Sequence, residues 1–140
     1  MAYCTQTDLQ DQIPSATLIQ LTDDAGAGAV VLAVIAKAIA DADAEINSYC
    51  ASRYSVPLSP VPAMILKISV DIAIYNLYAR RKGAPDDRKI RYDNAIRFLR
   101  DVSKGAVTLG AASPSPANTG DTVSFDGDDR IFTRGKMDGY

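Results

Sequence analysis

Apolar residues recur every three or four positions in two stretches of the chain, which is the spacing of one face of an α-helix. In the first stretch, from about residue 29 to residue 52, they are Val31, Ile35, Ile39, Ala42, Ile46 and Tyr49. In the second, from about residue 86 to residue 103, they are Tyr92, Ala95, Ile96, Leu99 and Val102. The pattern therefore predicts two amphipathic helices, each with one face turned toward a core.

A third predicted helix lies between these two, from residue 62 to residue 82, and it is apolar on nearly every side. Only four polar residues interrupt its central run, namely Lys67, Ser69, Asp71 and Asn76. Such a helix must be central in its own fold or be covered by neighbouring subunits. For Asp71 we expect a structural pair with Lys67 or an arginine, in preference to a role as a catalytic acid.

Three prolines, Pro57, Pro60 and Pro62, lie in the link "RYSVPLSPVPAMI" before this apolar helix. Pro62 suits the first position of a helix, where its missing N–H is no loss. Prolines restrict the unfolded chain, and the link contains no glycine that would favour a hinge. We therefore predict a rigid corner in which Pro57 and Pro60 hold an extended approach. The apolar side chains Val56, Leu58 and Val61 would close the end of the core.

Weaker signals predict two short helices near the N-terminus. Thr5 with Asp8 three residues later resembles a capping box, and Pro14 would end that helix. Ser15 would cap the second helix, "SATLIQLT", which a loop, "DDAGAGA", would follow. Residues 1–110 are thus expected to form an all-α bundle of three main helices and short N-terminal helices.

Residues 111–140 are predicted to form a linker and an extended, partner-binding tail. The composition after Gly105 is rich in Gly, Pro and Ser, which is typical of linkers. Two strand-like pieces, 122–125 and 130–133, flank a turn-like Asp126–Gly127 pair, but an isolated hairpin is marginal in water. The apolar tail residues would therefore anchor on another surface. They are Val123, Phe125, Ile131, Phe132 and Tyr140.

Charge is distributed unevenly along the chain, although the net charge is only −2. Residues 1–79 carry three basic and eight acidic groups, whereas residues 80–104 carry nine basic and four acidic groups. The basic groups are either a solvated helix face or a patch that contacts a neighbouring subunit or nucleic acid. A small basic-helix nucleic-acid-binding protein is thus an alternative function. The candidate patch comprises Arg80, Arg81, Arg88, Arg91 and Arg97.

The residues needed for common enzyme chemistry are scarce. The chain has no histidine, which removes the usual general base, the Ser-His-Asp and Cys-His arrangements and most transition-metal sites. No phosphate-binding glycine loop is present. The acidic residues of the tail favour a solvated turn over a cation site; they are Asp126, Asp128 and Asp129. We expect neither catalysis nor a cofactor.

Cysteine usage and hydropathy indicate where the protein works. Cys4 and Cys50 lack a short spacing, so we expect reduced intracellular thiols, with Cys50 in the core. The N-terminus has no basic start followed by an apolar run, so no signal peptide is predicted. The most apolar segment contains Lys67 and Asp71 and is short for a membrane span, so no membrane association is expected.

An ordered series of segments resembles a known phage family. The series begins with T-x-x-D-L at Thr5 and continues through the segments "LIQLTD", "ADADAEINSYCASRY", "VPLSPVPAMI", "DIAIYNLYARR", "RYDNAIRFLRDVSKG" and "RIFTRGKMDGY". In this order it is similar to the small gene-product family of Mu-like phages and prophages, which is placed among the head–tail connector (adaptor) proteins of tailed phages. The similarity covers almost the whole chain except residues 111–120.

This resemblance implies a structural virion protein of the phage neck, assembled in the host cytoplasm. A homo-oligomer, a dodecameric ring of about twelve copies, would sit beneath the portal and extend the DNA channel. DNA would pass through it without sequence-specific binding. The ring would meet a stopper or tail-terminator protein, and the C-terminal tail would clasp the portal protein.

Overall fold

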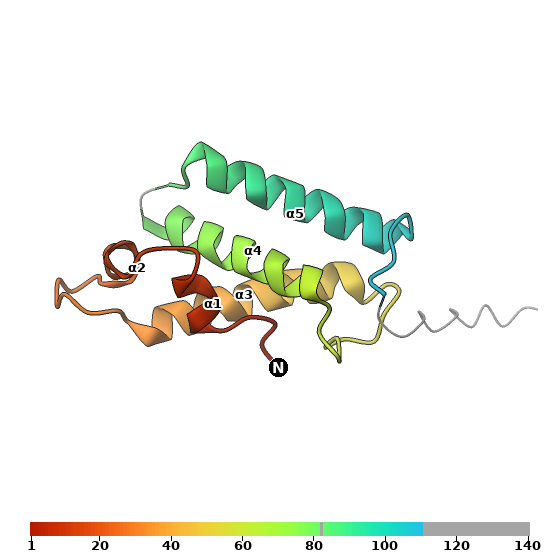
Figure 1. Cartoon of the computed structure of the whole chain (residues 1–140), viewed down its shortest axis with the longest axis horizontal. Coiled ribbons are helices and arrows are strands. Elements are labelled where there is room, and N and C mark those ends of the chain that lie inside the picture. The colour runs from red at the N-terminus through yellow and green to blue at the C-terminus, as the bar shows by residue number, and fades with distance from the viewer. Residues whose placement is uncertain (82, 111–140) are drawn as a thin grey trace, which may run out of the picture.

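Helix α4 (Ala63–Arg81) lies between α3 (Leu32–Cys50) and α5 (Asp86–Lys104), and two short helices, α1 (Gln6–Gln10) and α2 (Ser15–Thr22), pack beside them (Figure 1). The computed structural model describes residues 1–81 and 83–110, and these contain no strand. The predicted all-α fold is therefore confirmed. The predicted strand-like pieces and the five apolar tail residues lie outside the described residues.

The apolar residues around α4 are buried because the other helices of the same chain cover it. α4 contacts each of the four other helices. Its fully covered side chains include Ile65, Ile68, Ile72, Ile74 and Leu77. Of the two alternatives that the sequence left open, the central position in the subunit's own fold is the one observed.

The predicted apolar faces of α3 and α5 form the remaining walls of the core. On α3 the buried positions include Ile35, Ile39, Ala42 and Ile46, and on α5 they are Ala95, Ile96, Leu99 and Val102. α3 begins about three residues later than predicted, because Val31 is extended and occupies the N-cap position. Val31 is therefore exposed and does not belong to the buried face.

The last turn of α5 ends at Gly105, which adopts the left-handed conformation with φ of 79°. A side chain at this position would also collide with the Arg53 guanidinium, which lies against it. The left-handed backbone therefore favours glycine here, whereas the flexible Arg53 side chain could move away from an added side chain.

The short helices confirm one predicted cap and contradict another. Thr5 and Asp8 form the predicted capping box, with the Thr5 N–H donating to Asp8 Oδ2 at 2.7 Å. Ser15 does not cap α2, because it is already the first helical residue. Pro14 occupies the cap position and its carbonyl accepts the N–H groups of Thr17 and Leu18.

The proline-rich corner differs from the prediction in two details. Pro62 lies just before α4 and its carbonyl accepts the N–H groups of Ile65 and Leu66, so it stands one position earlier than expected. The approach is not extended: the chain bends at residues 56–57 and 59–60, where the Val56–Pro57 and Ser59–Pro60 peptide bonds are cis.

Both cysteines are buried free thiols, as expected for Cys50, which is fully covered. Among the described residues, no helix has both the length and the hydropathy needed to cross a bilayer.

Candidate interaction surfaces

The corner is attached to the N-terminal segment and to α3 through the hydroxyl of Tyr3. This hydroxyl accepts a hydrogen bond from the Leu58 N–H at 2.9 Å and donates one to the Asn47 side chain. Tyr3 is almost fully buried, and burial raises the pKa of its hydroxyl. Leu58 is buried beside it as predicted, whereas Val61 is only partly buried and Val56 is exposed, so the prediction that Val56 closes the core is wrong. One side chain therefore joins three segments of the chain.

A small polar cluster continues from Tyr3 into the core. The Tyr3 N–H donates to Asp43 Oδ1 at 3.2 Å, and Ser69 Oγ lies 3.3 Å from the same oxygen and 3.2 Å from Cys4 Sγ. Burial raises the pKa of the Asp43 carboxyl and of the Cys4 thiol. A thiol with a raised pKa is a poor nucleophile, so the surroundings of Cys4 do not favour thiol chemistry.

Asp71 forms the ion pairs that the sequence predicted. Its buried carboxylate lies 2.9 Å from Lys67 Nζ and 3.8 Å from Arg91 Nη1. Both cations remain largely exposed, so Asp71 is paired at the edge of the core, where all three side chains line a small hollow. The predicted pairing of Asp71 with Lys67 and an arginine is confirmed.

Arg80 and Arg81, at the end of α4, bind the loop that follows α2. Arg80 forms a bidentate pair with Asp24, with both N–O distances 2.8 Å, and it also donates to the Leu21 carbonyl. Arg81 donates to the Asp23 carbonyl. The Arg80 guanidinium lowers the pKa of the Asp24 carboxyl. These two arginines therefore contact their own chain.

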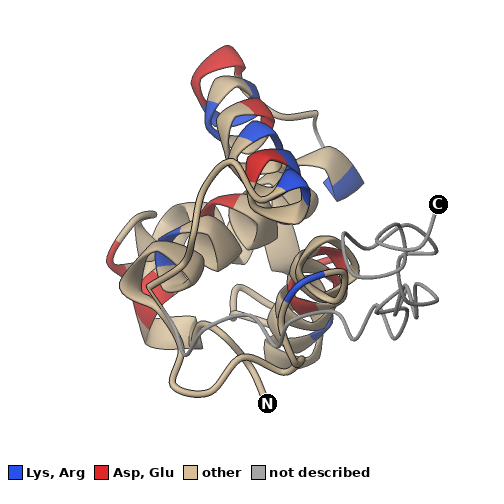
Figure 2. Cartoon of the chain, turned by 90° about the vertical axis from the view of Figure 1, so that its right-hand side faces the viewer, with Lys and Arg blue, Asp and Glu red and all other residues tan. Residues whose placement is uncertain are grey.

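The other three residues of the predicted basic patch lie on α5, which carries many of the basic positions (Figure 2). Arg88 donates to the Gln12 carbonyl at 3.3 Å, and Arg91 pairs with Asp71. Arg97 is exposed and lines a hollow between α3 and α5. The five arginines thus have different partners on two helices, and their predicted role in subunit contacts stays a prediction.

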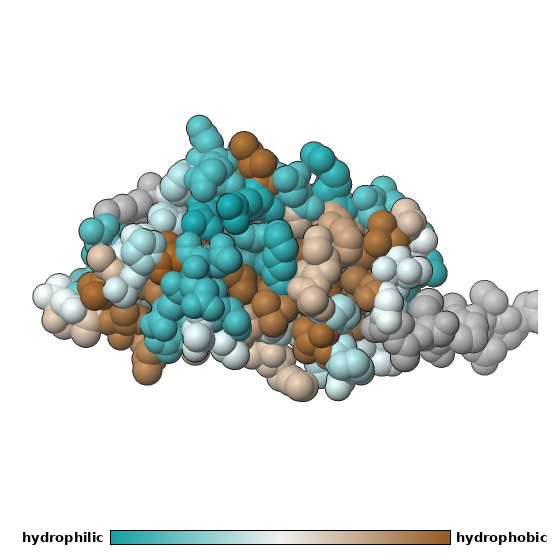
Figure 3. Space-filling view, viewed as in Figure 1, coloured by the Kyte–Doolittle hydropathy of each residue, from teal (hydrophilic) through white to brown (hydrophobic). Residues whose placement is uncertain are grey.

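Within the described residues, exposed charge without an ion-pair partner remains near the C-terminal end of α5. Arg97, Arg100 and Lys104 have no carboxylate within ion-pair distance among residues 1–81 and 83–110. Hydrophilic residues also dominate the upper part of the face in Figure 3, over α5. Among the described residues, this end of α5 is therefore the strongest candidate for an electrostatic contact with another protein subunit.

The loop after α2 is closed by hydrogen bonds to the Asp23 carboxylate. The Asp23 carboxylate accepts the N–H groups of Gly28 at 2.6 Å and Ala27 at 3.0 Å. These hydrogen bonds lower the pKa of Asp23. No group of three or more residues able to hold a metal occurs in the part of the chain that the structure describes.

Replacing Asp23 with alanine is expected to lower the Tm at neutral pH, with a smaller effect in acid. The native pKa of Asp23 lies below the ordinary value of 3.8, so its ionised form stabilises the fold above that pH. This stabilisation is lost as the pH falls through the native pKa. Thermal melts of the wild type and the variant at pH 7 and pH 2 check this. Asp93→Ala, on the exposed side of α5, is the control. A change in Tm for Asp23→Ala that is the same at both pH values would contradict the stabilising role of the ionised Asp23 carboxylate.

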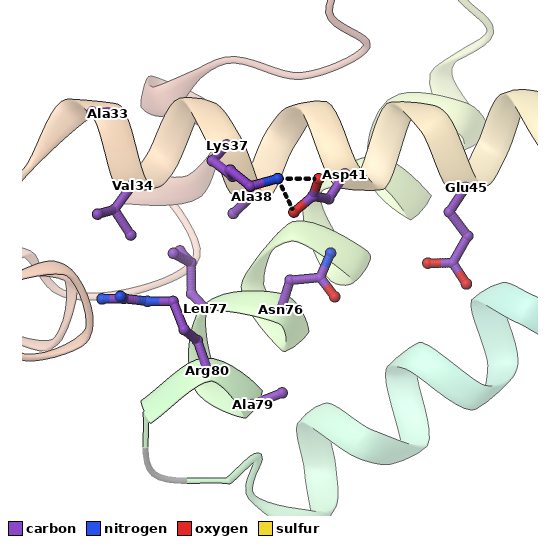
Figure 4. Close-up of a pocket in the computed structure, with 10 residues that line it drawn as sticks. All are labelled: Ala33, Val34, Lys37, Ala38, Asp41, Glu45, Asn76, Leu77, Ala79 and Arg80. Carbon is purple, nitrogen blue, oxygen red and sulfur yellow. Dashed lines mark hydrogen bonds and ion pairs between the residues drawn. The ribbon is translucent and has the colours of Figure 1, made fainter.

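A large groove lies between α3 and α4 (Figure 4). Its volume is about 720 Å³, and small or apolar residues form much of its lining: Ala33, Val34, Ala38, Leu77 and Ala79. Lys37 and Asp41 form an ion pair at 2.8 Å along its rim. The side chain of Asn76 points into it (Figure 4).

Tyr92 links α5 to α3 and α4. Its ring stacks on that of Tyr75, with centroids 4.1 Å apart, and its hydroxyl donates to Glu45 at 2.9 Å. Burial and the Glu45 carboxylate raise the pKa of Tyr92 to about 12. Glu45 lines the groove and Tyr92 lines the hollow that contains Arg97, so this hydrogen bond lies between the two hollows.

The sequence did not indicate the role of Tyr3 or the groove. Tyr3 was one aromatic residue in an unpatterned N-terminal segment, and its partners are 44 and 55 residues away. The alanines of α3 and α4 were a visible signal, because small residues on facing helices leave space between them, but which of them face each other depends on helix packing.

The sequence model of the family described as "Bacteriophage Mu, Gp36" matches residues 3–126, which include all five helices. The chain belongs to the bacteriophage Mu Gp36 family. The resemblance inferred from the ordered segments is therefore confirmed, and this Gp36-family chain is a protein of Mu-like phages or prophages.

Two relatives illustrate how far the similarity extends. The Mu-like prophage FluMu protein gp36 of Haemophilus influenzae (strain Rd) is 40% identical over 78 residues, which make up 56% of this chain and 54% of that protein. The chain thus spans about half the length of that relative. Gene product J of Escherichia phage Mu is 29% identical over 143 residues, covering 100% of this chain and 99% of that protein.

Proposed function

We propose that the chain is a structural protein of the phage particle, a head–tail connector subunit that works in the neck. The observation that carries the proposal is membership of the Mu Gp36 family over residues 3–126. In this role the subunits form a ring under the portal, extend the DNA channel and meet a stopper or tail-terminator protein. Assembly takes place in the host cytoplasm, and no catalytic step is involved.

Electrostatic contacts between neighbouring copies support the ring. Asp41 is exposed and Glu45 partly exposed on α3, whereas Arg97, Arg100 and Lys104 are exposed on α5. A ring needs contacts between two different surfaces of adjacent copies, and opposite charges on separate helices fit that requirement. Arg80 and Arg81 contribute less, since Asp24 already pairs with them.

The apolar residues of the tail supply the contact with the portal. Residues 111–121 act as a spacer, and Phe125, Phe132 and Tyr140 are the aromatic anchors after it. Buried aromatic residues contribute strongly to binding at protein interfaces. The tail therefore attaches each subunit of the ring to the portal protein.

Replacing Phe125 and Phe132 together with serine is expected to abolish binding to portal rings, because it removes two of the three aromatic anchors while leaving residues 1–110 unchanged. Co-sedimentation of the full-length variant with purified portal rings measures this, and a loss of at least about 100-fold in affinity corresponds to a few kcal/mol.

The matched control is the spacer variant Ala111→Ser and Ala112→Ser, which should bind portal rings like the wild type. Circular dichroism establishes that the helical core is intact in both variants. Undiminished co-sedimentation of the Phe125→Ser/Phe132→Ser variant would overturn the portal-binding role of the tail.

A further inference from the structure

The groove between α3 and α4 is an unfilled apolar surface on an otherwise well-covered core. Its volume of about 720 Å³ falls in the range of sites that hold a ligand or several side chains. Leu77 at its base is fully covered by the fold, whereas Ala33 and Ala79 on its walls are exposed. The alanines create the space, because their side chains are too short to meet across it.

We infer that residues 122–133 of the same chain occupy this groove when the protein is free. This inference goes beyond the proposed connector function and does not require a portal. The segment holds four apolar side chains in two pairs, and extended peptides commonly bind by placing such side chains in a groove. The pairs are Val123 with Phe125, and Ile131 with Phe132.

The path of the chain allows this arrangement. The last described residues lie beside the C-terminal end of α3, because the Leu109 N–H donates to the Tyr54 hydroxyl at 3.1 Å. From Cys50 back to Lys37, at the rim of the groove, the helix rises roughly 20 Å at 1.5 Å per residue. Residues 111–121 can span up to about 36 Å, so residue 122 can reach the groove.

The groove is lined by both kinds of charge, with the cations Lys37 and Arg80 beside the carboxylates Asp41 and Glu45. Lys37 pairs with Asp41 and Arg80 with Asp24, so apolar contacts and not net charge would hold the segment. The acidic residues between its apolar pairs would remain at the rim. They are Asp126, Asp128 and Asp129. The Asn76 amide, which points into the groove in Figure 4, offers a donor and an acceptor to a peptide backbone.

Occupancy by the same chain is favoured over occupancy by a second copy in dilute solution. A segment joined to its own groove binds at an effective concentration of about the millimolar range, far above that of free copies. The portal, by binding the same apolar residues, would compete with the groove. The segment would then be held against its own subunit until the partner is present.

Trypsin cleavage after Arg130 and Arg134 in the full-length protein tests the inference, because a peptide held in the groove is cleaved slowly. Ala33→Glu and Ala79→Glu, made separately, place a charge at an exposed wall of the groove with little effect on helix formation. Each variant is expected to raise the cleavage rate about tenfold, in proportion to the released population. Mass spectrometry of the C-terminal peptides measures the rate.

Ala36→Glu is the matched control, because Ala36 is an exposed alanine of α3 outside the groove lining, and its cleavage rate should equal that of the wild type. Circular dichroism establishes that each variant is folded. Wild-type cleavage rates in both groove variants would overturn the inference. The cleavage rate of the wild type should also be independent of protein concentration. If protection from trypsin disappeared on dilution, the occupant of the groove would be a second copy, and occupancy by the same chain would be overturned.

Discussion

Replacing Ile72 with alanine is expected to lower the free energy of unfolding by about 2–5 kcal/mol. Ile72 is fully buried on α4, the helix that contacts every other helix of the described fold. Removing three carbon atoms there loses apolar burial and leaves a cavity that the surrounding helices cannot fully close. This would be a large share of the 5–15 kcal/mol that is typical of a domain.

Urea denaturation followed by circular dichroism measures this effect. Leu66→Ala is the matched control on the same helix, because Leu66 is 39% exposed and its truncation should cost about 1 kcal/mol or less. Equal losses for the two variants would contradict the central position of α4, and they would indicate that contacts outside the chain cover Leu66.

Replacing Tyr3 with phenylalanine is expected to lower the free energy of unfolding by about 1–3 kcal/mol. The change removes a single oxygen but leaves the buried Leu58 N–H without its acceptor and Asn47 without its donor. An unsatisfied buried polar group costs more than the hydrogen bond itself contributed.

The matched control is Tyr78→Phe on α4, which removes a tyrosine hydroxyl away from the corner. Both variants are compared by urea denaturation, and amide hydrogen exchange reports Leu58 directly. Faster exchange of the Leu58 amide is expected in Tyr3→Phe alone. If stability and exchange were unchanged, Tyr3 would not hold the corner, and the prolines would be sufficient to do so.

The three long helices could be predicted because their signal is periodic and local. The buried residues of α3 and α5 recur at helical spacing, and the lack of a polar face on α4 required burial on several sides. The capping box at Thr5 was predictable for the same reason, since both partners lie within one turn. The pairing of Asp71 with Lys67 also depends only on helical spacing.

Two kinds of feature were predicted less well: those for which neighbouring residues compete for the same position, and those that depend on residues distant in the sequence. Pro14 and Ser15 both fit the start of α2, and sequence alone did not show that the Pro14 carbonyl would accept the first helical N–H groups. The bends around Pro57 and Pro60 depend on which side chains the corner meets. Tyr3 was missed because its partners lie on segments that only the folded chain brings together.

The basic patch shows the same limit. A count of charges along the sequence predicted five arginines with a shared role, but Arg80 and Arg88 contact segments at least 56 residues away in the sequence. Pairing within the subunit removes part of a patch that looks continuous along the sequence. The exposed charges near the end of α5 became identifiable only when these partners were known.

The two tyrosine hydrogen bonds near the corner also determine how the chain is closed during folding. Tyr3 to Leu58 and Tyr54 to Leu109 each join residues 55 apart in sequence. The loss of chain entropy on closing a loop of this length costs a free energy of about 3.5 kcal/mol, plus a constant that does not depend on loop length. The two loops overlap at residues 54–58, so together they enclose nearly all of the described chain. Opening those five residues would release both hydrogen bonds at once, so we expect local opening of the corner to loosen the N-terminal segment and the chain after α5 together.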